Sequence, residues 1–343
     1  MKIVIFDVEP WECETFEALN KDHDVVFEEG PLDAGSADTH SDAEIISAFI
    51  YSDHSRDTLA RFDNLKFIAT RSTGFDHIDM DWCRENDVAV SNVPTYGAHT
   101  VAEHVFALLL AISHKVVEAA DRTRRGDFSQ GGLQGFDLKG RTIGIVGTGD
   151  IGAHAAGIAC GFGMEVLAFD VKPREEIAEE IGFAYVDMDE LLQMSDIISL
   201  HVPGNETTEN LIDADAFDKM KDGAIVINTA RGSVVDTEAL LKALSSGKLG
   251  AAGLDVLPEE PVLREESELL RTYFTRAHNL DRLLADHILL RLRNVVITPH
   301  TAFNTREAVQ RILDTSLKNI EGFLHGSPPN AVSLEDAKGS NVG

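Results

Sequence analysis

Short apolar runs alternate with polar, helix-compatible stretches along most of the chain. Within the first hundred residues, the apolar runs predict five strands, at 3–6, 25–27, 45–51, 65–70 and 88–90. Runs of this length, separated by helical stretches, are typical of a parallel sheet with helices on its faces. The pattern therefore predicts a first α/β domain, and none of its strands is followed by a glycine fingerprint.

A second set of apolar runs predicts a second parallel sheet. Its strands are expected at 142–146, 164–169, 196–203, 224–228, 250–254 and 295–298. Before it, residues 100–125 predict one long helix, with Thr100 and Glu103 as a capping box and an apolar middle that should be buried. After it, an amphipathic helix over 304–325 is expected to return to the first domain.

Three glycines follow the first strand of the second sheet, at Gly147, Gly149 and Gly152. Glycines at this spacing between a strand and a helix, with Asp170 ending the next strand, predict a dinucleotide site. The helix N-terminus offers N–H groups and a positive dipole end to the phosphates. Asp170 would accept hydrogen bonds from a ribose and repel a 2′-phosphate, which favours NAD over NADP. The alternative is an ordinary glycine-rich turn.

The charge balance narrows the possible partners. The net charge is −28 and the acidic residues are spread along the chain, which argues against nucleic acid and membrane partners. This composition fits either a well-solvated surface or a salt-adapted host. Cys13, Cys83 and Cys160 are far apart without metal-ligand spacing, so we expect reduced thiols, a cytoplasmic location and no metal. No signal peptide or membrane span is expected.

Four polar residues stand at or shortly after the carboxyl ends of predicted strands of the second sheet: His201, Arg231, Asp255 and His300. Because the carboxyl ends of parallel strands share one edge, these residues should gather beside the glycine motif. The imidazolium of His300 suits protonation of an alkoxide, and Arg231 suits a substrate carboxylate. With Glu260 as a carboxylate that orients His300, the set predicts interconversion of 2-oxo and 2-hydroxy acids.

Each member also has an ordinary structural interpretation. A histidine after a proline also serves as a capping or core residue, and Arg231 also suits a surface ion pair. Glu259 is an alternative to Glu260 as the carboxylate that faces the site. His201 is interpreted as part of the cofactor pocket wall rather than as a catalyst.

A turn of small residues follows the fourth strand of the first domain, at Ser72, Thr73 and Gly74. Parallel sheets bind ligands at the carboxyl ends of their strands, so the backbone N–H groups of this turn suit a substrate carboxylate. A plain loop between strand and helix is the alternative, and position alone does not separate the two.

Together these motifs resemble those of the D-isomer-specific 2-hydroxyacid dehydrogenases. The resemblance rests on 72–74, 101–104, 147–152, 228–232, 254–261 and 298–302. It implies an α/β fold of two doubly wound parallel-sheet domains. Residues 1–98 and 300–332 would form a smaller flavodoxin-like substrate domain, residues 99–299 a Rossmann NAD-binding domain, and 333–343 a tail. It also implies a homodimer joined through the cofactor domain.

The same resemblance implies roles for individual residues. The catalytic set would be Arg231, Glu260 and His300, with the histidine as acid and base. Substrate contacts would come from Ser72, Thr73, Gly74, Tyr96 and Arg231. Cofactor contacts would come from Gly147, Gly149, Asp150, Ile151, Gly152, Asp170, Val202, Pro203, Thr208, Thr229, Ala230, Arg231 and Asp255.

Within that family the chain is most similar to the D-lactate dehydrogenase branch. Tyr96, the Thr301-Ala302-Phe303 run and a long insertion at 263–294, with a predicted helix over 280–292, carry this similarity. It implies reduction of a small 2-oxo acid, pyruvate first, with NADH. The Pro258–Pro261 segment instead resembles the phosphoglycerate type. A glycerate or hydroxypyruvate enzyme and an NADH-sensing, co-repressor-like binding protein are therefore the alternatives.

Asp150 departs from the family pattern. Relatives often carry a basic or neutral residue at this position, beside the pyrophosphate. Either its side chain points to solvent and only its N–H is used, or it faces the phosphates and weakens cofactor binding.

Overall fold

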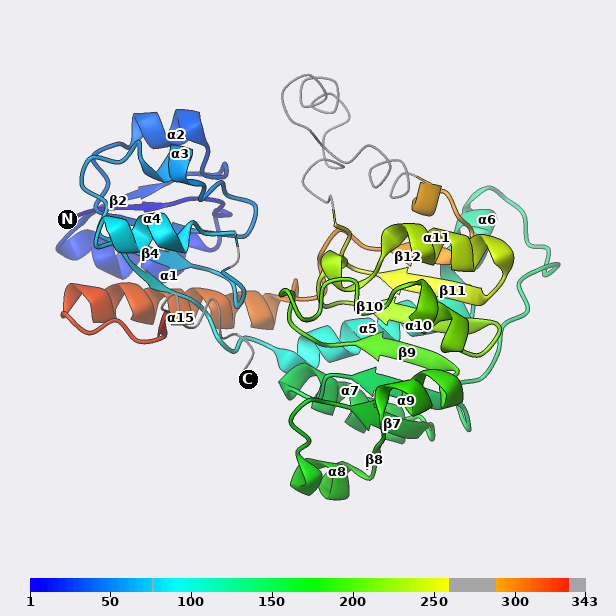
Figure 1. Cartoon of the computed structure of the whole chain (residues 1–343). Helices are drawn as coiled ribbons and strands as arrows, with labels where there is room; N and C mark the ends of the chain where they lie inside the picture. The colour runs from blue at the N-terminus through cyan, green and yellow to red at the C-terminus, as the bar shows by residue number, and fades with distance from the viewer. Residues whose placement is uncertain (76, 259–287, 333–343) are drawn as a thin grey trace. The chain divides into compact units, whose positions relative to one another are not determined.

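A computed structural model describes residues 1–75, 77–258 and 288–332, and it divides into two compact units (Figure 1). Unit 1 joins Met1–Gly97 to the chain from Asn304 onward, and unit 2 is Ala98–Phe303. The first boundary lies one residue before the expected one, and the second lies four residues after it. The substrate and cofactor roles given to the two units do not follow from this division alone.

Unit 1 is built on a six-stranded sheet. Its strands are β1 (Lys2–Ile5), β2 (Asp24–Phe27), β3 (Ile45–Ala48), β4 (Phe67–Thr70), β5 (Ala89–Ser91) and β13 (Ala331–Val332). The order is β13-β5-β4-β3-β1-β2, in which the first five strands of the chain are parallel and β13 pairs antiparallel with β5. The order 2-1-3-4-5 of the parallel strands is the flavodoxin-like one.

Helices cover both faces of this sheet because successive strand residues point to opposite sides. They are α1 (Cys13–Phe16), the 3-10 helix η1 (Glu17–Lys21), α2 (Ala34–Thr39), α3 (Arg56–Leu59), α4 (Met80–Glu85) and α15 (Arg306–Leu324). Ile3 and Ile5 pack with α1, η1 and α15, whereas Val4 and Phe6 pack with α2, α3 and α4. The last helix thus returns to the unit in which the chain begins.

Unit 2 is built on a seven-stranded parallel sheet. Its strands are β6 (Thr142–Val146), β7 (Glu165–Phe169), β8 (Ala184–Tyr185), β9 (Ile197–Leu200), β10 (Ala224–Asn228), β11 (Leu249–Leu254) and β12 (Val295–Ile297). The order is β12-β11-β10-β9-β6-β7-β8, and every adjacent pair is parallel. This Rossmann order places its switch point between β6 and β9, where such sheets bind ligands.

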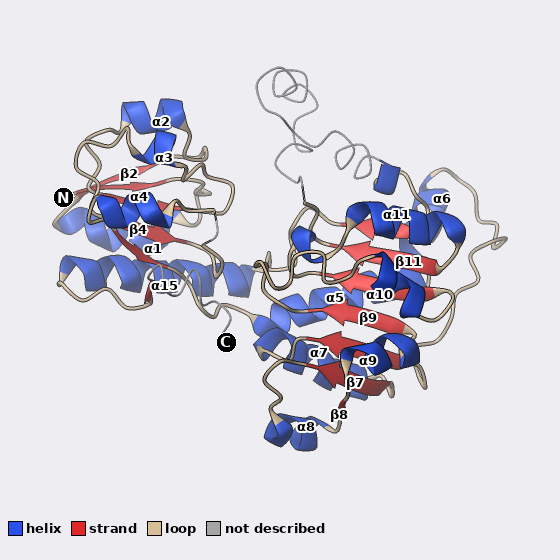
Figure 2. Cartoon of the chain, viewed as in Figure 1, coloured by secondary structure: helices blue, strands red, loops and turns tan. Residues whose placement is uncertain are grey.

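Two layers of helices enclose this second sheet (Figure 2). One layer is α5 (Ala98–Ser113), α7 (Asp150–Gly161) and α8 (Glu175–Ile181); the other is α9 (Met188–Met194), α10 (Ala214–Lys219) and α11 (Thr237–Ser246). Helix α6 (Val116–Arg124) and the 3-10 helix η2 (Gly232–Val234) complete the described elements. Ile145 and Val146 pack into opposite layers, so β6 is buried on both faces.

The prediction of a single helix over 100–125 is wrong. The structure has α5 and α6 instead, with Lys115 between them in the left-handed region at φ 52°. The carbonyl of Ser113 accepts a hydrogen bond from the N–H of Phe136 at 3.0 Å. A Cβ at Gly135 would lie 1.9 Å from that carbonyl oxygen, so the loop passes directly against the end of α5. Packing between distant segments, which local propensity does not encode, therefore ends the helix.

No single helix among the described residues is long and apolar enough to cross a bilayer. Helices α5 and α6 meet those criteria only when taken together, and the chain bends by 63° between them.

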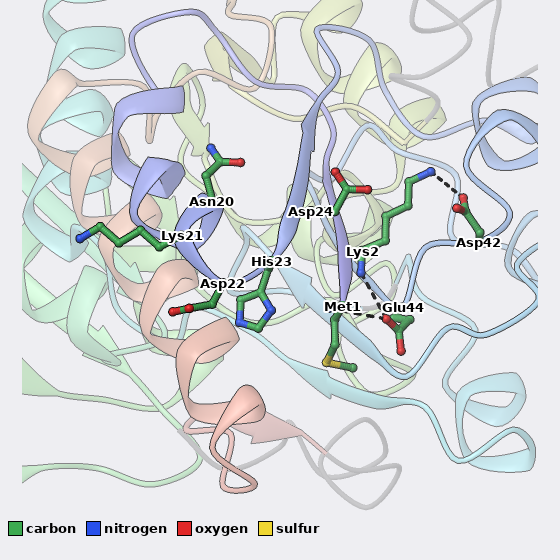
Figure 3. Close-up of a pocket in the computed structure, with 9 residues that line it drawn as sticks. All are labelled: Met1, Lys2, Asn20, Lys21, Asp22, His23, Asp24, Asp42 and Glu44. Atoms are coloured by element: carbon green, nitrogen blue, oxygen red, sulfur yellow. Dashed lines mark hydrogen bonds and ion pairs between the residues drawn. The ribbon is translucent and has the colours of Figure 1, made fainter.

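A shallow hollow lies at the amino ends of β1, β2 and β3 in unit 1 (Figure 3). It is lined by Met1, Lys2, Asn20, Lys21, Asp22, His23, Asp24, Asp42 and Glu44. Lys2 Nζ lies 2.5 Å from Asp42, and the Lys2 N–H donates to Glu44 at 3.2 Å. Its charges are thus partly paired within the hollow. Parallel sheets bind ligands at the opposite, carboxyl edge, which is where we place the candidate site.

Removing the buried side chain that anchors α15 tests how unit 1 is held together. Ile320 is fully buried beside β1, β4 and α1. We expect Ile320→Ala to lower the free energy of unfolding by about 2–5 kcal/mol, because it leaves a cavity in the core. Urea unfolding followed by tryptophan fluorescence reports this directly, since Trp11 and Trp82 both belong to unit 1. Lys318→Ala, on the exposed face of the same helix, should change it by less than about 0.5 kcal/mol.

Candidate active site

The glycine loop after β6 has room for backbone only. Gly147 has φ 92°, and a Cβ there would lie 2.9 Å from the carbonyl carbon of His201. A Cβ at Gly152 would lie 2.0 Å from the carbonyl oxygen of Gly147. Any larger residue at either position would displace backbone. The loop therefore forms a close-fitting cradle of the kind that admits a phosphate group.

Helix α7 begins directly after this loop, with Gly149 as its N-cap. No side chain caps the helix there. The N–H groups of the first turn, at Asp150, Ile151 and Gly152, have no acceptor within the helix. Together with the positive end of the helix dipole, they favour an anion at this point.

Asp170, at the end of β7, is held toward the glycine loop. Its carboxylate accepts hydrogen bonds from the N–H of Thr148 at 2.6 Å, from the Thr148 hydroxyl at 3.0 Å and from the N–H of Lys172 at 2.8 Å. Ionised carboxylate oxygens offer about four lone-pair sites in total, so acceptor capacity remains for ribose hydroxyls. This geometry fits the predicted contact between Asp170 and a ribose, and we take that contact up as a proposal below.

The end of β9 supplies the wall of the cradle. His201 lies 2.9 Å from the Ser199 hydroxyl, and burial lowers the pKa of His201 to about 4. Its ring is therefore neutral near pH 7 and unsuited to donating a proton. Val202 packs against Gly147, and the Thr208 hydroxyl donates to the carbonyl of Pro203 at 2.5 Å. That bond secures the turn from which the predicted cofactor contacts arise.

The end of β10 carries an unpaired buried hydroxyl. Thr229 Oγ1 has no hydrogen-bond partner among the described residues, although both ends of the Asn228 amide beside it are hydrogen-bonded. The Asn228 amide accepts from the N–H of Ala230 at 3.0 Å and donates to the carbonyl of Arg231 at 2.9 Å. A buried polar atom without a partner is destabilising unless a ligand or water bonds to it. Together with the glycine cradle, this atom shows that the residues fit a bound dinucleotide.

Close backbone packing fixes Arg231 at this edge. Its Nη1 donates to the carbonyl of Ala230 at 2.9 Å. A Cβ at Gly204 would lie 2.8 Å from Arg231 Cγ, and one at Gly232 would lie 2.3 Å from the carbonyl carbon of Leu257. Both glycines therefore permit the observed path of the arginine and its turn. The predicted Glu260 and its alternative Glu259 lie outside the described residues, as does most of the 263–294 insertion.

A buried carboxylate holds the loop that carries His300. Asp255, 1% exposed at the end of β11, accepts hydrogen bonds from the Thr298 hydroxyl and from the N–H groups of Thr301 and Ala302, both at 2.9 Å. Its own carbonyl accepts the N–H of His300 at 2.9 Å. His300 adopts a left-handed backbone, φ 52°, which is unfavourable without such support. We call Asp255 and its hydrogen bonds to the 298–302 loop the clamp. The clamp fixes the backbone from which the His300 imidazole projects.

The sequence analysis placed His104 in the 101–104 motif but gave it no role; in the structure it lies on α5 and bonds to the same loop and carboxylate. Its Nε2 lies 3.0 Å from Thr298 Oγ1 and 3.4 Å from Asp255 Oδ1. Burial alone would raise the pKa of Asp255, but the hydrogen bonds from His104, Thr298 and the two loop N–H groups outweigh it and lower the pKa. The predicted contact between Asp255 and the cofactor stays a prediction; in the structure the Asp255 carboxylate accepts hydrogen bonds from the loop. We assign it to positioning His300.

In unit 1 the predicted substrate turn is likewise fixed by hydrogen bonds. The Ser72 hydroxyl donates to the carbonyl of Gly74 at 2.7 Å, and the Thr73 hydroxyl donates to Val93 at 2.8 Å. Asn92 donates to the carbonyl of Thr73 at 2.7 Å. The carbonyl of Tyr96 accepts a hydrogen bond from Arg311 Nε of α15.

Arg71, just before that turn, is a residue that the sequence analysis missed. It is 3% exposed, donates to the carbonyls of Phe6 and Asp7, and lies 3.6 Å from the Glu12 carboxylate. Burial lowers the pKa of Arg71 and raises that of Glu12. Arg71 thereby ties the start of the turn to the end of β1.

Known proteins match this architecture over nearly the whole chain. A model of the NAD-binding domain of D-isomer-specific 2-hydroxyacid dehydrogenases matches residues 106–302. The 2-hydroxyacid dehydrogenase homolog 1 of Schizosaccharomyces pombe is 37% identical, over 94% of this chain and 96% of that protein. The D-lactate dehydrogenase of Escherichia coli is 34% identical, over 95% and 98%. A structure of Aquifex aeolicus D-lactate dehydrogenase complexed with NAD and lactic acid is 35% identical, covers 98% of both chains and has a TM-score of 0.80.

The chain belongs to the D-isomer-specific 2-hydroxyacid dehydrogenases. It is an NAD-dependent oxidoreductase that acts on CH–OH groups, and it is similar to D-lactate dehydrogenases. The predicted family, fold class, enzyme class and cofactor are thereby confirmed, and unit 2 contains the NAD-binding domain.

Replacing the clamp carboxylate tests its contribution to the fold of this dehydrogenase. We expect Asp255→Asn to lower the free energy of unfolding near pH 7 by about 2–4 kcal/mol, because an amide cannot accept all three loop hydrogen bonds. The folded pKa lies below the ordinary value of 3.8, so the carboxylate stabilises the fold above that value. The difference from wild type should shrink as the pH falls through the folded pKa.

Urea unfolding followed by circular dichroism, near pH 7 and near pH 3, measures both effects. Asp222→Asn is the control, because Asp222 is 90% exposed and pairs with the surface residue Lys248. A variant as stable as wild type at neutral pH would show that the clamp does not hold the loop.

Proposed function

We propose that the chain reduces a small 2-oxo acid, with pyruvate as the first candidate, to the D-2-hydroxy acid with NADH. One observation carries this proposal: Arg231 and His300 stand at the carboxyl ends of β10 and β12, in the sheet whose β6 ends in the glycine loop. A guanidinium for a carboxylate and an imidazole for a proton are what this reduction requires of the protein. The D-lactate dehydrogenases among the relatives support pyruvate.

The cofactor would lie along the carboxyl edge of the unit 2 sheet. The N–H groups of the glycine loop and of the first turn of α7, Gly147 to Gly152, would hold its pyrophosphate. Asp170 would accept the ribose hydroxyls. Val202, Pro203, Thr208, Thr229 and Ala230 would line the rest of the site. When bound, NADH supplies the hydride.

Arg231 and His300 divide the remaining work. Arg231 would bind the substrate carboxylate through two parallel N–H donors and so orient the carbonyl toward the cofactor. His300 would donate the proton that the alkoxide takes up, with Glu260 holding its ring in the protonated form. Asp255 and His104 would keep the His300 backbone in its left-handed conformation.

The contacts proposed on unit 1 are Ser72, Thr73, Gly74 and Tyr96, of which the first three would bind the carboxylate through backbone N–H groups. The Pro258–Pro261 run favours a second candidate substrate, hydroxypyruvate, because it resembles the phosphoglycerate type. Pyruvate and hydroxypyruvate differ by one hydroxyl group. A pocket that pairs that hydroxyl discriminates strongly, and an apolar pocket does so only weakly.

We also propose a cytoplasmic homodimer joined through unit 2. The exposed apolar side chains of Val116, Val117 and Phe128, 53%, 56% and 79% exposed, support an interface on that unit. The three free cysteines support a reducing compartment. Burial raises the pKa of the Cys83 thiol to about 12, so this thiol is unreactive near neutral pH.

Replacing His300 tests the proposed proton donor. Asn tolerates the left-handed backbone that His300 adopts, so His300→Asn should preserve the loop while removing the imidazole. We expect kcat for NADH oxidation with pyruvate to fall by about 100- to 10,000-fold. His325→Gln, at the exposed end of α15, is the matched control and should keep wild-type turnover.

Steady-state assays with pyruvate, hydroxypyruvate, glyoxylate, phenylpyruvate and 2-oxoisocaproate measure both the loss and the substrate preference. Near-normal turnover of His300→Asn would contradict the assigned role. A higher kcat/KM for hydroxypyruvate than for pyruvate would make hydroxypyruvate the proposed substrate.

Neutralising Asp170 tests the basis of cofactor choice. We expect wild-type kcat/KM to favour NADH over NADPH by at least about 100-fold, because the carboxylate repels a 2′-phosphate. Asp170→Asn should lower this preference for NADH over NADPH by about 10-fold. Glu175→Gln, which removes one exposed negative charge at the start of α8, is the control. An unchanged ratio in Asp170→Asn would show that another group excludes NADPH.

A further inference from the structure

Asp150 is paired across two loops with Arg174. Arg174 is the last residue before α8, and its Nη1 lies 3.6 Å from Asp150 Oδ1 on the first turn of α7. Its Nη2 also donates to the carbonyl of Thr148, inside the glycine loop. One guanidinium therefore donates a hydrogen bond to the loop and forms an ion pair with the acid that follows it.

The position of Arg174 is itself fixed by hydrogen bonds. Its backbone N–H donates to the Tyr185 hydroxyl at 3.0 Å, and that hydroxyl lies 2.7 Å from Thr148 Oγ1. Thr148 in turn donates to Asp170. The connection thus runs from β8 through the segment before α8 to the glycine loop. It places a positive charge beside the only acid in the first turn of α7.

A carboxylate at this position opposes the binding of a pyrophosphate. The first turn of α7 offers N–H donors and a positive dipole end, whereas Asp150 adds a negative charge at the same point. The Asp150 side chain is 66% exposed and that of Arg174 is 38% exposed, so the pair contributes little to folding stability. Its effect falls on a charged ligand instead.

We propose that Arg174 is the cofactor-positioning residue that makes Asp150 compatible with dinucleotide binding. It neutralises the acid beside the N–H groups that would hold the pyrophosphate. The proposal rests on the assignment of the cofactor to the glycine loop. It resolves both expectations for Asp150: the side chain is largely in solvent, and its charge is balanced by an arginine from another loop.

Ligand binding without turnover tests the proposal. Dissociation constants for NADH, ADP and adenosine are measured by fluorescence and calorimetry for wild type, Arg174→Gln, Asp150→Asn and the double variant. We expect Arg174→Gln to weaken the binding of NADH and ADP by about 3- to 10-fold. The affinity for adenosine should stay unchanged, because only NADH and ADP carry a pyrophosphate. The double variant should bind both within about twofold of wild type.

Two further comparisons separate charge from structure. In about 1 M KCl the loss in Arg174→Gln should shrink, because salt screens an exposed charge but does not restore a lost hydrogen bond. Arg174→Lys keeps the charge and should bind NADH within about twofold of wild type. Lys219→Gln is the matched control, because its exposed ion pair with Asp189 joins α10 to α9 and should not affect binding.

The outcomes are distinguishable. Equal NADH affinity in wild type and Arg174→Gln overturns the proposal, and so does a loss that Asp150→Asn fails to rescue. An equal loss of affinity for adenosine would assign Arg174 to the ribose instead, and this result also overturns the proposal. If wild type binds NADH but Gly152→Ala binds it equally well, the assignment of the cofactor to the glycine loop fails first. Thermal melting of each variant confirms that it is folded.

Discussion

Parallel strands deliver their carboxyl ends to one edge of a sheet, and every functional assignment made for this chain depends on that constraint. Segments that are far apart in sequence, such as the glycine loop and the Pro299–His300 turn, belong to one edge because β6 and β12 run in the same direction. The reversal of strand order between β6 and β9 provides the space beside the glycine loop. The chemistry is thus assembled by topology, and each strand contributes one or two residues.

A second constraint acts locally on His300. The Asp255 carboxylate is buried, ionised and bonded to three donors of the 298–302 loop. Because the loop groups and the carboxylate satisfy one another, the left-handed backbone of His300 is maintained without help from the ligand. Preorganisation of this kind lets an imidazole act without first paying the entropy of ordering its loop. The same logic applies to Arg71, whose buried guanidinium fixes the turn before Ser72 in unit 1.

The two acidic side chains beside the glycine loop, Asp170 and Asp150, are balanced in different ways. Asp170 accepts hydrogen bonds from Thr148 and Lys172 beside the glycine loop, and we propose that its remaining acceptor sites meet the ribose. Asp150 faces outward and is met by Arg174. Two acids close to one phosphate cradle are therefore tolerated for different reasons, one by position and one by pairing.

Most strands of both sheets were predictable from apolar runs bounded by polar turns, and the central ones, such as β3, β4 and β10, are buried on both faces. Strands β8 and β13 were not, since two residues make no pattern. The break between α5 and α6 depends on Gly135 meeting Ser113. The glycine motif and the residues after strands could be recognised locally. The roles of His104, Arg71 and Arg174 could not, because the partners of each lie in distant segments; the 101–104 motif marks His104 but does not show what it bonds to.

The most direct test of the central claim is the stereochemistry of the reverse reaction. NADH formation is followed with NAD and either the D or the L enantiomer of lactate, glycerate or 2-hydroxyisocaproate. The account predicts NADH formation from at least one D enantiomer and none above background from its L counterpart. Equal rates with both enantiomers, or a preference for the L form, would contradict the assignment of Arg231 and His300 to a D-specific site.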